Sequence, residues 1–400
     1  AIDFEIQGDF PKFGNDDEYL RGYEKIFQEA VRCRLRSNFS IGSELSGGLD
    51  SSSITCFSKK IMESKDNLET FSVIYSGLDD CDESCYIQKI VDHCHTQPNY
   101  VNGQDVDPFG ELERYSWLCD QPLYAHSMHT FWRLYSKAPE KNVRVILSGS
   151  EGDTTLGLDS YDYYLFDLFV NGKIRLLFSE LTRISNEESI SVFKLFFYRV
   201  MGIIAPTYFK EIWKKFLGGG YYDDYKSSIQ SLLKDRILSN PAVQNNIKEK
   251  ASLFKDIKSF RSKHLYNINS PFFQISFEEL DPLAAYFKTE IRYPFLDVRM
   301  LEYCFALPIE QLNMDIDRRI ARIAMEEVLP PEIQWRRDKS GVDTNFNLSL
   351  IKYGNEYIED MIDKSDPMND YFELDYLKEL YEKFKSKYQQ KDYDGIESNL

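Results

Sequence analysis

The chain has 400 residues, of which 42% are hydrophobic and 15% aromatic, so it can bury a large core and has room for about two structural units. Its 65 acidic and 48 basic residues give a net charge of −17, which disfavours a nucleic-acid partner. The seven cysteines, an odd number spread from Cys33 to Cys304, indicate a reducing, cytoplasmic setting rather than a disulfide framework. The chain starts Ala-Ile-Asp-Phe with no basic and apolar leader, so we expect no secretion.

The first 150 residues alternate between helical and strand patterns. A helix is predicted over Asp17–Ser37, where apolar side chains from Leu20 to Leu35 lie on one face. Strands are predicted at Ser40–Leu45, Thr70–Tyr75, Asn99–Val101 and Val143–Leu147, and helices over 53–62, 83–94, 108–119 and 126–138. This alternation predicts an α/β fold with a doubly wound parallel sheet, whose ligands bind beyond the carboxyl ends of the strands.

After residue 160, long helical patterns dominate. They cover Tyr161–Phe169, Ser189–Met201, Tyr208–Phe216, Asp317–Val328 and Leu374–Tyr388. We therefore expect an α/β core with a lead-in helix over residues 1–158 and a large, mainly helical part over 159–400. The most apolar stretch, Val192–Ala205, is interrupted by Lys194 and Arg199 and is too short to span a bilayer. It predicts a buried helix, with a groove for a partner peptide as the alternative.

The segment Leu45–Ser52 carries two glycines, an acid and three serines at a predicted strand-to-helix turn. Glycines let backbone N–H groups approach phosphate oxygens, and the positive end of the following helix favours negative charge. Asp50 would repel phosphate unless a cation such as Mg²⁺ lies between them. Neither the Walker pattern nor the dinucleotide-binding pattern occurs here. The segment predicts a pyrophosphate loop that binds ATP, with an ordinary serine-capped turn as the alternative.

Three later segments carry further acids, glycines and a lysine. Ser148–Gly157 is a second glycine-rich turn that bears Asp153, Glu290–Asp297 reads Glu-Ile-Arg-Tyr-Pro-Phe-Leu-Asp, and Trp335–Gly341 reads Trp-Arg-Arg-Asp-Lys-Ser-Gly. Together with the Ser-Gly-Gly-x-Asp-Ser loop, and in this order, they resemble the ATP pyrophosphatase (synthetase) domain of the asparagine synthetase family. The resemblance covers roughly residues 17–345.

The resemblance implies an adenine nucleotide alpha hydrolase-like fold and the activation of a carboxylate. Attack of that carboxylate on the α-phosphorus of ATP gives an acyl-adenylate and pyrophosphate, and ammonia or an amine then displaces AMP. The implied cofactors are ATP and Mg²⁺, the carboxylate is aspartate or a peptide, and a homodimer is left open. The backbone of the Phe71–Ile74 strand would read the adenine edge. Pyrophosphate would lie on Ser46, Gly47, Gly48, Asp50, Ser51 and Ser52, Mg²⁺ on Asp50 and Asp153, and adenosine on Leu45, Val73, Ser148 and Gly149.

The resemblance also implies catalytic candidates. Lys339 would neutralise phosphate charge in the transition state, Glu290 would orient or deprotonate the amine, and Glu151 is the glutamate of the second turn. The alternatives are a solvated surface lysine at Lys339 and a structural ion pair between Glu290 and Arg292. Asp297 is predicted to cap the helix that follows it rather than to bind a ligand.

Two departures from the family pattern limit what the resemblance implies. Glutamine-dependent members begin with a glutaminase domain that carries a catalytic cysteine, whereas Ala1 is followed closely by the predicted lead-in helix. We expect that this chain alone does not hydrolyse glutamine and that a glutaminase domain or a separate subunit would supply ammonia. The second turn has Ser150 where the family has glutamate. The serines at 51–53 and the form of Trp335–Gly341 are closer to the lasso-peptide cyclase branch, in which the amine belongs to the substrate.

Other functions remain as alternatives. A nucleotide-binding partner subunit without catalysis would retain the loop and bind ATP without forming pyrophosphate. An enzyme that modifies tRNA is disfavoured by the charge of −17 and by the lack of a Cys-x-x-Cys motif. A zinc site is disfavoured because its candidate ligands do not have the usual spacing; they are Cys81, Cys85, His93, Cys94 and His95.

Overall fold

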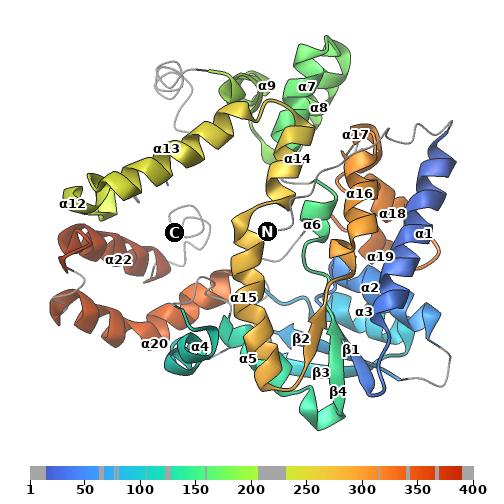
Figure 1. Ribbon diagram of the computed structural model, residues 1–400, viewed down its shortest axis with the longest axis horizontal. Coiled ribbons are helices and arrows are strands. Elements are labelled where there is room, and N and C mark those ends of the chain that lie inside the picture. The colour runs from blue at the N-terminus through green and yellow to red at the C-terminus, as the bar shows by residue number, and fades with distance from the viewer. Residues whose placement is uncertain are drawn as a thin grey trace. The chain divides into compact units, whose positions relative to one another are not determined.

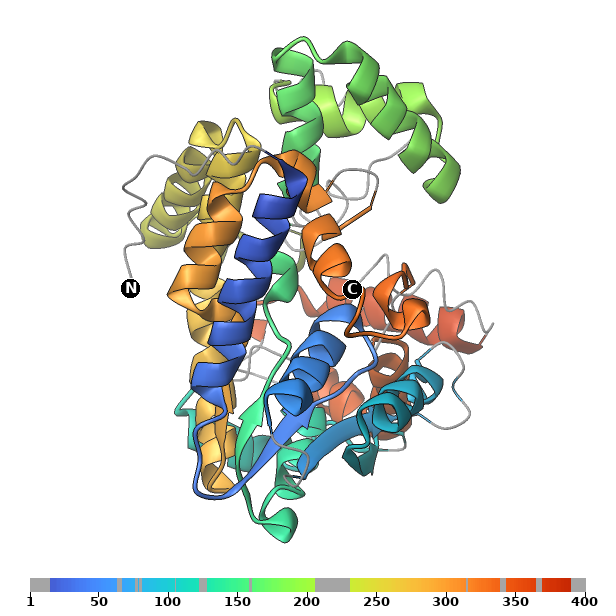
Figure 2. The ribbon, with the colours of Figure 1, turned by 90° about the vertical axis from the view of Figure 1, so that its right-hand side faces the viewer.

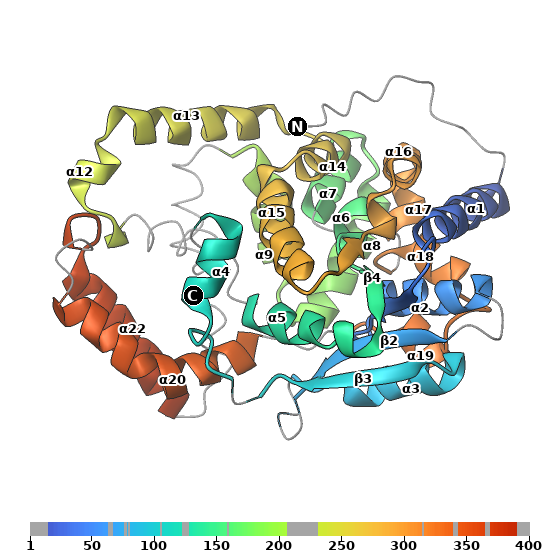
Figure 3. The same cartoon turned by 60° about the horizontal axis from the view of Figure 1, so that its bottom comes forward.

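The fold is described from a computed structural model for residues 15–62, 67–75, 78, 81–104, 106–121, 128–157, 160–205, 231–313, 316–338, 343–364 and 369–389. Within these ranges the strands form a five-stranded parallel sheet with the order β3-β2-β1-β4-β5 (Figure 1). The strands are β1 (Ser40–Glu44), β2 (Leu68–Ile74), β3 (Gln97–Asn102), β4 (Val143–Leu147) and β5 (Glu290–Arg292). Figure 3 shows β2 and β3 running side by side at one edge of the sheet.

Helices surround the sheet and belong to two stretches of the chain. Those of the first stretch are α1 (Asp16–Arg34), α2 (Leu49–Ile61), α3 (Ser84–Cys94), α4 (Leu112–Cys119), α5 (Met128–Ser136), η1 (Pro139–Lys141) and α6 (Gly152–Thr155). Those of the later stretch are α14 (Phe260–Ile268), α15 (Pro271–Tyr286), η5 (Pro294–Leu296), α16 (Val298–Ala306), α17 (Ile309–Asn313), α18 (Arg319–Ala324) and α19 (Pro331–Gln334), followed by the first residues of α20 (Asp343–Lys364); α20 after Ser349 belongs to the second unit described below.

The side chains of β1 show that helices cover both faces of the sheet. The hydroxyl of Ser43 lies 2.9 Å from that of Thr55 on α2, whereas the next residue, Glu44, accepts a hydrogen bond from Tyr135 on α5. Successive residues of a strand point to opposite faces, so α2 and α5 lie on opposite sides. The predicted α/β fold with a doubly wound parallel sheet is therefore confirmed. The sequence did not predict β5, because three residues are too few to show the alternation of buried and exposed side chains that marks a strand.

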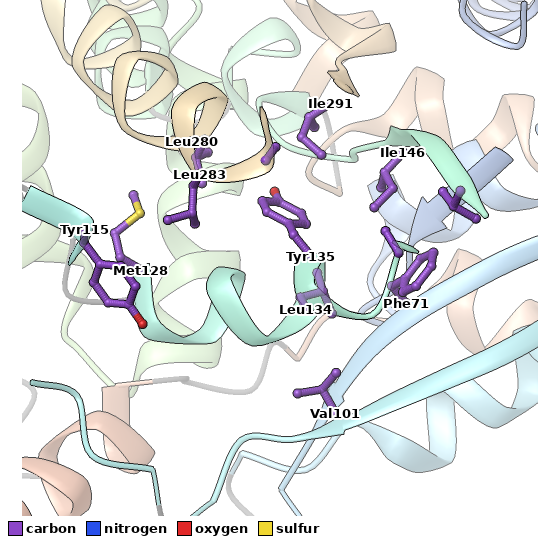
Figure 4. Close-up of a cluster of buried hydrophobic side chains, with 13 residues drawn as sticks. Phe71, Val101, Tyr115, Met128, Leu134, Tyr135, Ile146, Leu280, Leu283 and Ile291 are labelled. Atoms are coloured by element: carbon purple, nitrogen blue, oxygen red, sulfur yellow. The ribbon is translucent and has the colours of Figure 1, made fainter. Parts of the chain in front are cut away.

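A large apolar cluster fills the space between the sheet and the helices α4, α5 and α15. It contains Phe71 and Ile146 from the sheet, Tyr135 from α5 and Leu283 from α15 (Figure 4). Trp132 adds aromatic contacts with Tyr286 and Phe287. Because this core joins residues from both stretches of the chain, neither stretch completes it alone.

The first helix is held by residues from far along the chain. Tyr303 of α16 donates a hydrogen bond to the carbonyl of Tyr19, and Arg34 forms an ion pair with Asp297 at 2.7 Å. Figure 2 shows the blue helix α1 beside orange segments of the later stretch. Asp297 caps α16 by accepting a hydrogen bond from the N–H of Arg299, as predicted from the sequence. The charges of Arg299 and Arg34 hold the pKa of Asp297 well below its ordinary value.

The chain forms two compact units that differ from the two consecutive parts expected from the sequence. One contains residues 1–159 and 264–349, and the other contains 160–263 and 350–400. The expected boundary near residue 158 is retained, but the later stretch 264–349 belongs to the first unit. The reason is that β5 completes the sheet beside β4 and that α15 and α16 cover the core.

The second unit is helical in the part that the structure describes. Its helices are α7 (Tyr161–Val170), α8 (Ile174–Glu188), α9 (Val192–Leu195), η3 (Phe196–Val200), η4 (Met201–Ile203), α12 (Asp235–Leu238), α13 (Pro241–Asp256) and α22 (Leu374–Gln389). The predicted buried helix over Val192–Ala205 is wrong: the stretch divides into α9, a π-helical turn and a 3-10 turn, and Phe193 is 63% exposed. The predicted helix over 208–216 lies outside the described residues. No helix among the described residues is both long and apolar enough to cross a membrane.

Candidate active site

The strand order reverses at the centre of the sheet, between β1 and β4. From β1 the chain moves outward through β2 to β3, and it then returns to place β4 on the other side of β1. At such a reversal the connections leave the sheet in opposite directions, which opens a crevice at the carboxyl ends of the two strands. The two glycine-rich turns, Leu45–Ser52 and Ser148–Gly157, follow these two strands. The fold therefore brings them to the same place.

The first turn leads directly into α2. Gly47 has a φ of 77°, and a Cβ there would lie 2.7 Å from the Cβ of Tyr86, so only glycine fits between the loop and α3. Helix α2 starts after Gly48 with no side-chain hydrogen bond capping it. Its first N–H groups and the positive end of its dipole thus suit an anion. The hydroxyls of Ser46 and Ser51 lie 3.0 Å apart and brace the turn.

Ser52 differs from the other serines predicted to hold pyrophosphate. It is 0% exposed, whereas Ser46 is exposed at the turn. Its backbone N–H bonds to the carbonyl of Gly48 in the first turn of the helix. The structure therefore brings Ser46, Gly47, Gly48 and Ser51 together at the strand ends, while the side chain of Ser52 is buried.

The second turn packs directly on the first because two of its residues are glycines. A Cβ at Gly149 would lie 2.6 Å from the backbone N of Ser51, and one at Gly152 would lie 2.6 Å from the Cγ of Asp50. Contacts this close exclude any side chain at these positions. Asp153 follows on the same turn. The packing of the two turns thus places the two predicted metal-binding carboxylates, Asp50 and Asp153, beside each other.

A single arginine nitrogen lies between these two carboxylates. Nη1 of Arg318 is 2.7 Å from Oδ2 of Asp50 and 2.7 Å from Oδ1 of Asp153. Arg318 has a φ of 53°, a left-handed conformation that is unusual for an arginine and that directs the chain just before α18. The two acids therefore share one positive charge.

A buried ionic network supports Arg318 from behind. Its Nε is 3.0 Å from Asp317, and Asp317 also pairs with Arg322, which is 0% exposed. Burial opposes ionisation of Asp317, but the charges of Arg318 and Arg322 hold its pKa below the ordinary value. Arg322 in turn donates to the backbone carbonyl of Gln334 at 2.7 Å. The network fixes the segment that leads to the predicted Trp335–Gly341 motif.

The start of that motif contacts the first turn through Arg336. Its guanidinium lies 3.7 Å from the ring centroid of Tyr86, pairs with Glu83 at 2.7 Å and donates to the carbonyl of Gly47 at 3.3 Å. A buried arginine with these partners ties the motif to the first turn. Lys339, the predicted catalytic lysine, lies outside the described residues.

The predicted adenosine-binding residues lie along the other side of the first turn. The N–H of Leu45 bonds to the carbonyl of Phe71, which is the last β2 residue paired with β1. Val73 lies two residues further along β2, so its N–H and C=O point to the same edge as those of Phe71. The Val73 edge therefore faces the loop beyond the end of β1. Ser148 and Gly149 border the same crevice from β4.

Of the two predicted catalytic glutamates, Glu151 lies on the second turn and Glu290 does not. Glu290 is at the start of β5, two residues before the strand end, and it is exposed and paired with Arg292 at 2.8 Å. Arg292 lowers the pKa of Glu290 through this hydrogen bond. The structure thus does not bring Glu290 to the two turns, and its contacts match the ion-pair alternative. Glu151 lies on the second turn with a φ of 69° and accepts a hydrogen bond from Thr154 at 3.1 Å.

Glu44 is a residue of the crevice that sequence reasoning missed. It is the last residue of β1, and its carboxylate accepts hydrogen bonds from Tyr135 at 2.8 Å and from Ser148 at 2.5 Å. Burial raises the pKa of Glu44. The only signal in the sequence was a charged residue inside the otherwise uncharged run Ser40–Leu45, directly before the loop.

The candidate zinc ligands have separate partners. Nε2 of His93 lies 3.1 Å from the carbonyl oxygen of Val328, and Sγ of Cys94 is next to Cys56. Within the described part of the chain, no group of three or more His, Cys, Asp or Glu side chains could hold a metal ion. Nothing in this geometry supports a zinc centre.

Comparisons with known proteins agree with this geometry. A family model described as asparagine synthase matches residues 22–396. The chain belongs to the asparagine synthase family. It is 34% identical over 134 residues to a putative asparagine synthetase [glutamine-hydrolyzing] 2 of Methanocaldococcus jannaschii, which covers 34% of this chain and 25% of that protein.

Two Bacillus subtilis proteins are also similar. Asparagine synthetase [glutamine-hydrolyzing] 2 is 27% identical over 147 residues, covering 34% of this chain and 19% of that protein. Asparagine synthetase [glutamine-hydrolyzing] 3 is 23% identical over 335 residues, covering 80% of this chain and 48% of that protein. Each alignment therefore covers less than half of the relative's own length.

Proposed function

We propose that this chain is an ATP-dependent, AMP-forming amide synthetase. The observation that carries the proposal is the convergence of Asp50 and Asp153 on one nitrogen of Arg318, at the carboxyl ends of β1 and β4. The open start of α2 lies at the same end of the sheet and suits a polyphosphate. Family membership supports the same chemistry.

The two carboxylates fit Mg²⁺. This ion prefers oxygen ligands and is usually held by one or two carboxylates together with the phosphates of a substrate. Asp50 and Asp153 would hold it, and the ion would supply positive charge against the departing pyrophosphate. Arg318 would then exchange its place between the acids for a place beside the phosphates. Lys339 is proposed to add a second charge there.

The proposed reaction joins a carboxylate to a nitrogen. The first turn and the start of α2 hold the phosphates of ATP while the carboxylate attacks the α-phosphorus and pyrophosphate leaves. Ammonia or an amine then attacks the acyl-adenylate and AMP leaves. Aspartate with ammonia is one substrate pair, and a peptide with a carboxylate and its own amine is the other. The relatives' names support the first pair, and Ser150 supports the second.

Formation of AMP tests this function. The purified chain is incubated with ATP and Mg²⁺, with and without aspartate plus ammonium or a panel of acidic peptides, and nucleotides are separated by chromatography. We expect AMP and pyrophosphate only when a carboxylate substrate is present. In Asp50→Asn and Asp153→Asn variants, we expect AMP formation to fall by about 100-fold, because each removes one of the two carboxylates proposed to hold Mg²⁺ against the phosphates.

Asp92→Asn is the matched control, since Asp92 is exposed on α3 and accepts a hydrogen bond from Gln88. It should keep the wild-type rate. Unchanged AMP formation in both Asp50→Asn and Asp153→Asn would disprove the roles of these residues. ATP binding without carboxylate-dependent AMP formation would instead favour a nucleotide-binding partner subunit.

A further inference from the structure

The carboxylate of Glu44 is positioned at the ligand edge of the sheet and held from two sides. Its Oε1 accepts from Tyr135 of α5, and its Oε2 lies 2.5 Å from Oγ of Ser148, at the end of β4. The residue keeps some accessible surface although its neighbours are buried: Tyr135 and Ser148 are each 1% exposed. A carboxylate in such a place costs free energy unless its hydrogen bonds are satisfied, so its retention requires a reason.

A chain of hydroxyl groups leads from this carboxylate to the second turn. Oγ of Ser148 lies 3.0 Å from Oγ of Ser150, and the N–H of Ser150 also bonds to Ser148. A hydroxyl has one proton to give. When Glu44 is ionised, Ser148 must give its proton to Glu44 and accept one from Ser150. When Glu44 is protonated, the two bonds can reverse. The three groups therefore form a continuous path for one proton.

Ser150 is placed where this path meets the candidate active site. It follows Gly149, whose backbone lies against Ser51 of the pyrophosphate loop, and it precedes Asp153 on the same turn. Ser150 is partly exposed. A serine alone is a poor proton acceptor at neutral pH, but a serine backed by a carboxylate can pass a proton on.

The other ionisable groups around Glu44 do not compete for this proton. Burial raises the pKa of Tyr135 and of Tyr293, so both phenols stay protonated at neutral pH. Asp281 on α15 and Glu151 act on Tyr293 from a distance, and both are acids. Glu44 is the carboxylate to which Ser148, and through it Ser150, is linked by hydrogen bonds.

We propose that Glu44, acting through Ser148 and Ser150, accepts the proton that the attacking amine loses during amide formation. The inference rests on the proposed function and adds a route for the proton that leaves the amine. As the nitrogen attacks the acyl carbon, the C–N bond forms and the bond from that carbon to the phosphate oxygen breaks, with its electron pair leaving on AMP. The nitrogen's proton moves to Ser150, the proton of Ser150 to Ser148, and that of Ser148 to Glu44, which becomes neutral.

Comparing the two halves of the reaction tests this route. Pyrophosphate exchange into ATP reports the first half, and amide formation with ammonium, or with the amine of the active peptide, reports the second. Both are measured with the carboxylate that supports AMP formation, for Glu44→Gln, Ser150→Ala and the control Ser136→Ala. We expect amide formation in the first two variants to fall about 100-fold more than exchange does. The control, whose hydroxyl bonds to Arg133 on α5, should affect neither half.

A pH profile separates proton transfer from a structural defect. At a constant concentration of neutral amine, raising the pH supplies more hydroxide to take the proton lost during attack, so it should restore part of the amide formation in Glu44→Gln relative to wild type. Misplaced substrate would not respond in this way. Equal losses in both halves, or unchanged amide formation in Ser150→Ala, would overturn the relay while leaving the proposed function intact. If wild-type protein shows no carboxylate-dependent exchange, the proposed function fails and the relay fails with it.

Discussion

At the scale of single residues, the candidate site depends on charges that are buried and paired. Arg322 is 0% exposed and is held by Asp317 and by the carbonyl of Gln334. Arg318 forms an ion pair with the same aspartate, Asp317, and lies between Asp50 and Asp153. Because partners already hold these charged side chains in place, the side chains lose little conformational entropy when a ligand binds. This is electrostatic preorganisation. These arginines therefore prepare the crevice for anions before any substrate binds.

Replacing Arg336 tests how the late motif is attached to the pyrophosphate loop. Arg336→Met keeps the length of the side chain but removes its ion pair with Glu83, its stacking on Tyr86 and its bond to Gly47. Because Glu83 is left partly buried and without this partner, we expect a loss of stability of about 3 kcal/mol. We also expect a KM for ATP about tenfold higher. Denaturant unfolding and steady-state kinetics measure the two effects.

The neighbouring residue provides the control for this substitution. Arg337 is exposed, so Arg337→Met should change stability by less than about 0.5 kcal/mol. If both variants have the same stability and the same KM for ATP, Arg336 does not tie the motif to the loop.

Single residues also show the limits of the sequence. Asp50 and Asp153 could be predicted because each stands in a short glycine-rich pattern whose chemistry is local. Glu44, Arg318 and Arg336 could not, because their roles come from partners up to 289 residues away, as for Arg336 and Gly47. Glu290 was predicted from its motif, but its position at the start of β5 became visible only from the pairing of that strand with β4.

At the scale of elements, the site is the contact between two turns. The turns follow adjacent parallel strands, and glycines at 149 and 152 remove the side chains that would hold them apart. The separation of Asp50 from Asp153 is therefore set by backbone packing rather than by side-chain flexibility. We expect a methyl group in this contact to displace the carboxylates of Asp50 and Asp153 while the fold itself is kept.

Gly152→Ala tests this contact. The new Cβ would lie 2.6 Å from Cγ of Asp50 and must displace that side chain. We expect AMP formation to fall at least about tenfold and stability to fall by about 1–2 kcal/mol, since the methyl group overpacks a tight contact. Chromatographic measurement of AMP and thermal unfolding provide the two values.

Gly110→Ala is the matched control for the added methyl group. Its Cβ would lie 3.5 Å from Asp107, an ordinary contact distance. It should leave AMP formation unchanged. Wild-type activity in Gly152→Ala would show that the position of Asp50 does not depend on the closeness of the two turns.

At the scale of the whole molecule, the α/β core is built from two separated stretches of chain. Residues 264–349 belong to the same compact unit as the first 159 residues. They supply β5, the helix α15 that covers the apolar cluster, and the Tyr303 contact to α1. The core therefore closes only when the later stretch has been added.

A fragment of residues 1–158 tests this dependence. Without β5 and α15, the side chains around Tyr135 and Phe71 would face water, and the lost burial would remove much of the folding free energy. We expect no cooperative thermal transition and strong binding of an apolar dye. A sharp transition with native-like near-ultraviolet circular dichroism would show instead that the first stretch is an independent domain.

The sequence alone determined the alternation of strands and helices, the two glycine-rich turns that bear Asp50 and Asp153, and the cap at Asp297. All of these depend on residues close together in the chain, where periodicity, glycine conformation and capping act. Only the tertiary structure decided that Arg318 joins the two acids, that Arg336 holds the loop and that Glu44 is linked to Ser150. Those contacts arise from strand order and long-range packing, which local patterns do not encode.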